Sequence, residues 1–419
     1  MTSPGTPNAA IRLPPTVPYY VKGLALAIPI YLVLVHAWIW VLSAPVFLAG
    51  RTDFRQFYAA GFMVRTGHAT QLYDYTAQKQ FQDDLISRES VALPFVSPAY
   101  HALLFAPLST LSYRPAYFVF LAINFAALGL CFALLLPWTH NLQALHRWLP
   151  LAIFLGFLPI AIALIQGQDS ILLTALLAGA LVSLTKRRNF FAGILVGLGL
   201  FKFQLALPVA LLFLIWRRWR FVLGFSCSAI VLGSVSVWVA GIAQTKVYMQ
   251  SLIAIAGFGS GTGLAQYPVS LQMMANVHGF IFGAGAGHAP EPWLQAITIA
   301  LAGAVLGWTA LRGLSIKDTA SLFLLTLPCC VLVAHHTYVH DLSVLLLPTI
   351  VLLDSFLLSE AQDNKHDQWI NRMAAMMFVA PAVEPLFPNH FYLASLAVLL
   401  LLTSVAAASN SHARSQYPA

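Results

Sequence analysis

The chain has 419 residues, of which 59% are hydrophobic and only 9% are charged. Soluble proteins carry about 25% charged residues, so this composition excludes a water-soluble globule, a disordered scaffold and a secreted disulfide-rich domain. The class that remains is an all-α polytopic membrane protein. The net charge of +8 is small for the length, and the four cysteines lie in apolar runs without a CxxC spacing. They indicate neither a disulfide framework nor a metal site.

The first apolar run covers residues 19–49 and is not followed by a small-residue cleavage site, so we expect a retained first spanning helix. It is longer than the roughly 20 residues that a bilayer needs, and its C-terminal end should present Arg51 and Asp53 at a membrane surface. With this run, about twelve spans in a single domain over 1–419 are predicted. The later spans are 116–137, 149–166, 169–185, 189–201, 204–216, 221–242, 293–311, 318–334, 341–357, 371–386 and 390–409.

Two of these runs, 189–201 and 204–216, are too short to cross a bilayer separately. They predict a hairpin whose tip, near Lys202 and Gln204, stops inside the membrane beside a water-filled or protein-lined cavity. The stretch 94–111 is apolar but is interrupted by three prolines. We therefore predict that it is interfacial or re-entrant rather than spanning.

The short basic loops set the predicted orientation. KRR at 186–188 and RRWR at 217–220 flank the hairpin, and basic residues in short loops favour the cytoplasmic side. Both termini are then cytoplasmic, and two large loops, 51–115 and 243–292, are extracytoplasmic. Most acidic residues also fall on the outer side, which suggests that the chemistry takes place there. The predicted location is the plasma (inner) membrane.

The first outer loop contains two segments with helical spacing of apolar residues. One runs over 54–63 and should end at Gly67, and the second covers 76–87. Short amphipathic helices that lie in the membrane interface fit this pattern. These helices either contribute to a site or only cap the bundle, and the sequence leaves both interpretations open.

Asp53 lies where the first helix leaves the membrane, between Arg51 and Arg55. A carboxylate in this place could act as a general base for an acceptor hydroxyl that enters from outside. The alternative interpretation is a loop carboxylate in a local ion pair.

Lys202 is an ionisable residue deep in the apolar hairpin, with few neighbours expected to neutralise it. Such residues are costly and mark functional sites, and an ammonium suits a phosphate. The alternative is a lysine that snorkels from a short helix end. In the turn QGQD at 166–169, Gln168 and Asp169 could hydrogen-bond a sugar, or they could be turn and N-cap residues.

The segment HHTYVHD contains His335, His336, His340 and Asp341 within seven residues. A helix would place His336 and His340 on one face, because they are four residues apart. Zinc would need a third ligand from elsewhere, so a histidine acting on a phosphate is the better functional interpretation. The chain contains no DxD, GxxxxGK[ST] or Rossmann glycine motif, and its dispersed basic residues do not suggest nucleic-acid binding. No metal or cofactor is predicted.

Several segments, in this order and spacing, resemble glycosyltransferase family 87, whose members are GT-C-type polyprenyl-phosphate-mannose-dependent mannosyltransferases. The matching segments are TDFRQFYAAG with RTG and LYD (52–74), PFVSPAYHALLFAPLSTLSYRPAY (94–117), QGQDSILLTALLAGA (166–180), FAGILVGLGLFKFQLALPVALL (191–212) and HDLSVLLLP (340–348). The chain departs from the family where Ser97-Pro98-Ala99 stands in place of a Pro-Pro pair. This difference affects the fit of the acceptor rather than the chemistry.

The resemblance implies a GT-C fold with twelve spans and an extracytoplasmic site. It also implies an inverting, metal-independent transfer of mannose from polyprenyl-phosphate-mannose to a hydroxyl of a lipid- or glycan-linked acceptor. The family's aspartate base maps to Asp53. Its late histidine maps to His340, although His335 and His336 could equally be the relevant pair. Four further residues are assigned to the donor, namely Lys202, Arg55, Gln168 and Asp341, and three to the acceptor, namely Tyr58, His101 and His336.

Two alternatives to mannose transfer remain from the sequence. The first is transfer of a pentose such as arabinofuranose from the same lipid carrier. The second is a lipid or solute transporter, but transporters commonly contain inverted repeats, and the two halves of this chain differ in their loops and in the single short hairpin. We therefore expect the partners to be a lipid-phosphate sugar, a hydroxyl acceptor and membrane lipids.

Overall fold

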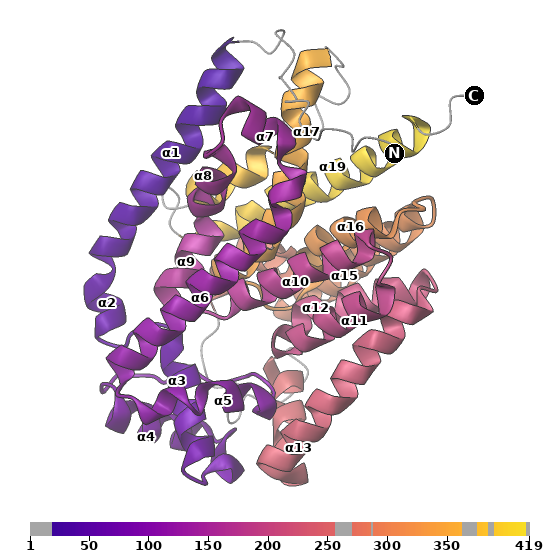
Figure 1. The fold of residues 1–419 in the computed structure, drawn as a ribbon. Helices are drawn as coiled ribbons and strands as arrows, with labels where there is room; N and C mark the ends of the chain where they lie inside the picture. The colour runs from indigo at the N-terminus through magenta and orange to yellow at the C-terminus, as the bar shows by residue number, and fades with distance from the viewer. Residues whose placement is uncertain (1–18, 256–269, 286–287, 363–374, 384–388, 416–419) are drawn as a thin grey trace, which may run out of the picture.

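A computed structural model describes residues 19–255, 270–285, 288–362, 375–383 and 389–415 (Figure 1), and these residues form helices and turns without a β-strand. The prediction of an all-helical chain is therefore confirmed. The α-helices are α1 (Tyr19–Leu42), α2 (Ala44–Leu48), α3 (Phe54–Arg65), α4 (Tyr75–Leu85), α5 (Ala99–Phe105), α6 (Tyr113–Leu135), α7 (His140–Leu145), α8 (Leu149–Gly156), α9 (Leu158–Gln166), α10 (Ser170–Thr185), α11 (Asn189–Leu198), α12 (Phe203–Ile215), α13 (Trp219–Ile255), α14 (Val277–Gly285), α15 (Glu291–Gly313), α16 (Thr319–Val333), α17 (Leu346–Gln362) and α19 (Ala394–Ser415). Short 3-10 helices are η1 (Ala69–Gln71), η2 (Leu108–Thr110), η3 (Leu136–Trp138), η4 (Gly199–Lys202), η6 (Leu271–Met273), η7 (Val339–Leu345) and η9 (Phe391–Leu393).

Within the described residues, six helical stretches are long and apolar enough to cross a membrane, or seven if α8 and α9, bent by 56°, form one span. One of the six, residues 189–215, consists of α11, η4 and α12, which form a hairpin rather than one straight helix. The predicted number of twelve is therefore not confirmed. Two predicted spans are shorter helices, α10 and α16, and residues 371–386 lie partly outside the described part of the chain. The chain is a multi-pass membrane protein whose helices differ widely in length.

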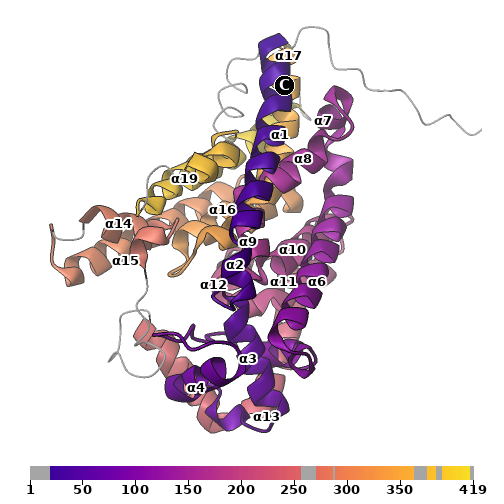
Figure 2. The ribbon, with the colours of Figure 1, turned by 90° about the vertical axis from the view of Figure 1, so that its left-hand side faces the viewer.

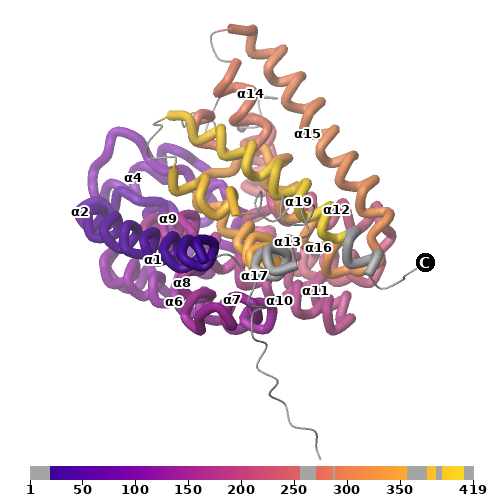
Figure 3. The backbone as a smooth tube through the Cα atoms, turned by 90° about the horizontal axis from the view of Figure 1, so that it is seen from above, coloured from indigo at the N-terminus to yellow at the C-terminus, as the bar shows by residue number. Residues whose placement is uncertain are grey.

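The helices of the first large loop (51–115), α3 to α5, gather at one end of the molecule (Figure 1). The long helices α1, α6 and α13 lead to that end, and α14 and α15 stand to one side of the bundle (Figures 2 and 3). In α1, α13 and α15 only 17% of the most apolar window is buried within the protein. Their outer faces are therefore apolar surfaces suited to lipid.

Helices α11 and α12 form the predicted hairpin, with η4 at its tip. Helix α11 runs parallel to α13 at very close range, because a Cβ on Gly193 would lie 2.0 Å from the carbonyl oxygen of Phe221, and one on Gly197 would lie 2.6 Å from the Cβ of Ser228. A Cβ on Gly224 would likewise lie 1.9 Å from the carbonyl oxygen of Phe190. Small residues allow this approach between membrane helices. A three-residue turn separates α12 from α13, and Phe213 of α12 stacks near Phe221 with ring centroids 4.0 Å apart. Helix α12 therefore runs back, antiparallel to α11.

The two large loops that were predicted to be extracytoplasmic differ from the predictions in detail. In the first, α3, α4 and α5 occupy the predicted helical and proline-rich segments, and Gly67 follows α3 with a φ of 82°. In the second, α13 continues past a kink at Gly241 to Ile255, so the segment predicted to begin at residue 243 starts as helix. Part of this loop, 256–269 and 286–287, lies outside the described residues.

Candidate active site

A cavity of about 250 Å³ lies where the first large loop (51–115) meets the tip of the hairpin. It is bordered by the residue before α3, the turn between α9 and α10, the hairpin tip and the segment that leads into η7. Its ionisable and amide side chains include Asp53, Gln168, Asp169, Lys202, His335, His336, His340 and Asp341. Residues far apart in the sequence thus provide one concentrated polar site in an otherwise apolar chain.

Asp53 is held in this cavity by both glutamines of the QGQD turn. The Nε2 of Gln168 donates a 2.6 Å hydrogen bond to Oδ2 of Asp53, and the backbone N–H of Asp53 donates to Oε1 of Gln166 over 3.3 Å. The Asp53 side chain remains 23% exposed. Its neighbours Arg51 and Arg55 bind other partners, so the alternative of a local ion pair with them is not what the structure shows.

The QGQD turn is fixed by its glycine. Gly167 ends α9 with a left-handed φ of 60°, which favours glycine, and a Cβ there would lie 2.8 Å from the Cβ of Phe54. The backbone N–H of Gln168 then bonds back to the carbonyl of Ala163 over 2.9 Å, and Asn124 donates to the carbonyl of Gln168 over 3.1 Å. The turn thus fixes the Gln168 side chain next to the carboxylate of Asp53.

Lys202 is surrounded by oxygen atoms rather than isolated. Its Nζ donates to Oδ1 of Asp341 at 2.7 Å and to Oε1 of Gln168 at 3.2 Å, and it forms an ion pair with Oδ1 of Asp169 at 3.2 Å. The prediction of few neutralising neighbours is wrong, because the partners come from distant parts of the chain. The interpretation as a snorkelling lysine also does not fit, since the side chain is 9% exposed and directed at carboxylates.

Asp169 and His101 form the inner side of this cluster. The carboxylate of Asp169 makes no capping bond to α10, and its Oδ2 lies 3.1 Å from Nε2 of His101. The His101 ring is fully buried and stacks on Phe201 with centroids 5.0 Å apart. His101, which was assigned to the acceptor, does not line the cavity; it lies behind Asp169.

The late histidine segment also lines the cavity. His340 lies between two carboxylates, with Nδ1 3.9 Å from Oδ2 of Asp53 and Nε2 3.6 Å from Oδ1 of Asp341. The expectation that a helix places His336 and His340 on one face is wrong, because residues 334–338 are irregular and η7 begins only at Val339. Both histidines nevertheless reach the cavity.

Burial sets the protonation state of these two imidazoles. It lowers the pKa of His336 to about 4, although Asp341 opposes the shift. It also lowers the pKa of His340, again against the attraction of Asp341. Both rings are therefore neutral at pH 7 and can still donate one hydrogen bond each.

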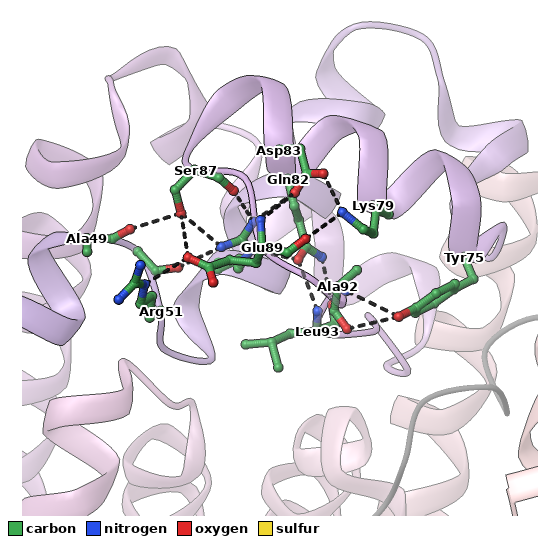
Figure 4. Close-up of polar contacts among 12 residues, drawn as sticks. Ala49, Arg51, Tyr75, Lys79, Gln82, Asp83, Ser87, Glu89, Ala92 and Leu93 are labelled. Carbon is green, nitrogen blue, oxygen red and sulfur yellow. Dashed lines mark hydrogen bonds and ion pairs between the residues drawn. The ribbon is translucent and has the colours of Figure 1, made fainter.

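Arg55 belongs to the structure of the first loop and not to the cavity. Its side chain is 1% exposed and donates to Oε1 of Gln82 at 2.8 Å and to the carbonyl of Ser87 at 2.5 Å. Figure 4 shows the surrounding network, in which Ser87 donates to the carbonyl of Ala49 and Arg51 donates to Glu89. We therefore assign Arg55 to the loop rather than to the donor.

The same network builds one wall of the cavity. The Gln82 amide pairs with both backbone groups of Leu93, accepting at 3.1 Å and donating at 2.7 Å. Gln78 holds Phe95 in the same way, accepting from its N–H at 2.7 Å. Leu93 and the following extended residues line the cavity. Tyr58, assigned to the acceptor, donates to the carbonyl of Leu111 at 2.8 Å and lies outside this wall.

By formal charge, three carboxylates face one ammonium at the site: Asp53, Asp169 and Asp341 against Lys202. No group of three or more His, Cys, Asp or Glu side chains among the described residues is arranged to hold a metal ion. A bound anion would therefore meet one cation that is already paired and two neutral histidines.

The fold and the cavity are those of a multi-pass helical membrane protein with a polar site that contains carboxylates. The family model of glycosyltransferase family 87 matches residues 95–348, which is more than half of the chain, and the protein belongs to that family. The match includes Gln168, Lys202 and His340, whereas Asp53 lies before it. No curated protein and no solved structure matches the chain.

Proposed function

We propose that this membrane glycosyltransferase moves mannose from polyprenyl-phosphate-mannose to a hydroxyl of a lipid- or glycan-linked acceptor on the extracytoplasmic face. One observation carries the proposal: the partly exposed carboxylate of Asp53 lines the same cavity as His340, Lys202 and Asp341. A base and groups that can bind a phosphate beside one cavity suit a single displacement with inversion. The apolar helices around the site suit a donor with a hydrocarbon tail.

In the proposed reaction, Asp53 accepts the proton of the acceptor hydroxyl while the oxygen of that hydroxyl forms a bond to the anomeric carbon. The bond between that carbon and the phosphate oxygen breaks, and the phosphate leaves with the electron pair. The leaving group changes from a phosphodiester monoanion to a phosphomonoester, which can carry a second negative charge. Stabilising this developing charge is the main electrostatic task of the site.

His340 and His336 are proposed to donate hydrogen bonds at the phosphate side, with His336 also within reach of an acceptor. Lys202 already donates hydrogen bonds to Asp341 and Gln168, and its ammonium pairs with the carboxylate of Asp169 at 3.2 Å. It would therefore act on the phosphate mainly through its charge, with Asp341 holding it in place. This arrangement uses no metal ion and no cofactor.

An assay of the purified protein with labelled donors tests the proposal. We expect transfer from polyprenyl-phosphate-mannose, and this transfer should continue in excess EDTA. Polyprenyl-phosphate-arabinofuranose serves as the second donor, because the sequence leaves the pentose alternative open. Preference for the pentose would change the sugar but keep the chemistry. Full loss under EDTA, restored by Mg²⁺ or Mn²⁺, would contradict the metal-free mechanism.

Labelling of single cysteines tests the proposed face. Thr70→Cys in the first loop and Arg187→Cys in the KRR turn both change exposed residues, and each is made in a chain whose four native cysteines are replaced. We expect a membrane-impermeant thiol reagent to reach position 70 from outside intact cells and position 187 only after permeabilisation. Labelling of both positions from the same side would contradict the extracytoplasmic site.

A further inference from the structure

Gln168 connects the proposed base with the buried cation. Its Nε2 lies 2.6 Å from Oδ2 of Asp53, and its Oε1 lies 3.2 Å from Nζ of Lys202. The residue is 4% exposed, so water has little access to this connection. A single amide therefore spans the two charged groups of the site.

The orientation of this amide is fixed by its partners. An ammonium can only donate hydrogen bonds, so the amide oxygen must face Lys202. A carboxylate accepts them, so the amide nitrogen must face Asp53. Lys202 is in turn held by Asp341 at 2.7 Å and by Asp169 at 3.2 Å. The cation thus prevents the amide from turning over and presenting its oxygen to the base.

The backbone of Gln168 is equally constrained. It follows the left-handed Gly167, its N–H bonds to Ala163, and its carbonyl accepts from Asn124. With both backbone and side chain fixed, the amide N–H has one position relative to Asp53. Because the hydrogen bond occupies Oδ2, the other carboxylate oxygen is left for an incoming hydroxyl.

We propose that Gln168 is a positioning residue that orients Asp53 as the base, and that Lys202 acts through it. This inference rests on the proposed function of Asp53. It replaces the expectation that Gln168 binds the donor sugar directly. The amide N–H stabilises the ionised carboxylate, which must stay unprotonated to accept the hydroxyl proton. The QGQD turn then positions the base: Gln166 binds the backbone N–H of Asp53, and Gln168 binds its carboxylate.

Two variants of nearly equal size separate positioning from other roles. Gln168→Glu keeps an acceptor for Lys202 but places a second carboxylate against Asp53, which raises the pKa at which the pair takes up a proton. Gln168→Met removes both hydrogen bonds without adding charge. Gln143→Glu, in α7 at the other end of the molecule, is the control for adding a carboxylate. The readouts are kcat, KM and the pH dependence of kcat.

For Gln168→Met we expect kcat to fall by about 10- to 100-fold with KM nearly unchanged, as for the loss of a hydrogen bond to a charged group. For Gln168→Glu we expect the acid limb of the pH profile to move up by about one pH unit or more. Gln143→Glu should match the wild type. A structural role would reduce the amount of folded enzyme without moving the acid limb.

Two results would overturn the inference. A higher KM with unchanged kcat in Gln168→Met would show that the residue binds substrate. An unmoved acid limb in folded Gln168→Glu would show that it does not act on the base. Asp53→Asn, measured in parallel, distinguishes these failures from failure of the proposed function, because full activity in Asp53→Asn would mean that Asp53 is not the base at all.

Discussion

Asp53→Asn is expected to slow transfer by about 10²–10⁴-fold, the usual contribution of a positioned base. Asparagine has nearly the shape of aspartate, and its side-chain oxygen can still accept the hydrogen bond from Gln168. It cannot take up the proton of the acceptor hydroxyl. The fall should therefore appear in kcat, measured with saturating labelled donor, while binding of the donor is largely kept.

Asp74→Asn is the matched control for this variant. Asp74 lies in the same loop, but its carboxylate caps α4 by accepting from the backbone N–H groups of Thr76 and Ala77. Asparagine is as good an N-cap as aspartate, so this change should leave both stability and kcat unaltered. Near-normal turnover of Asp53→Asn beside a normal Asp74→Asn would exclude Asp53 as the base.

Lys202→Met should produce the largest loss of stability. The change removes the cation between Asp169 and Asp341 and leaves their carboxylates buried together. Removing one partner of a buried ion pair costs about 3–5 kcal/mol. A large fall in the thermal unfolding midpoint of the purified protein in detergent is the measurement. Lys79→Met, which breaks the partly exposed pair with Asp83, should cost less than about 1 kcal/mol.

A second substitution tests the electrostatic cause. If unpaired carboxylates destabilise Lys202→Met, adding Asp169→Asn should restore part of the unfolding midpoint. Loss of packing alone would leave the double variant as unstable as the single one. A Lys202→Met protein that unfolds at the wild-type temperature would show that the ion pairs contribute no net stability.

The hairpin could be predicted because its signals are local. Two apolar runs too short to cross a membrane, each next to a basic turn, indicate a chain that enters and returns on the same side. The close contact of α11 with α13 through Gly193 and Gly224 could not be predicted from local signals, because it depends on how distant segments pack. The number of spans was less predictable, since hydropathy does not separate a spanning helix from a short buried one such as α10.

The cavity residues Asp53, Gln168, Lys202 and Asp341 could be found from residue type and placement. Their pairing could not, because the partners of Lys202 lie 34 and 139 residues away from it in the sequence. The carboxylate of Asp169 looked like an N-cap because its partners, His101 and Lys202, are also distant in the sequence. Arg55 looked available to a phosphate because nothing in its neighbourhood showed that Gln82 and Ser87 would fold back over it.

A cryo-electron microscopy structure of the Asp53→Asn variant with polyprenyl-phosphate-mannose would test the central claim most directly. The variant should bind the donor and turn it over slowly, so that the complex survives long enough to image. We expect the phosphate to lie within hydrogen-bonding distance of His340, with the anomeric carbon between it and the side chain at position 53. A donor headgroup bound outside this cavity, with the phosphate away from His340 and Lys202, would contradict the account.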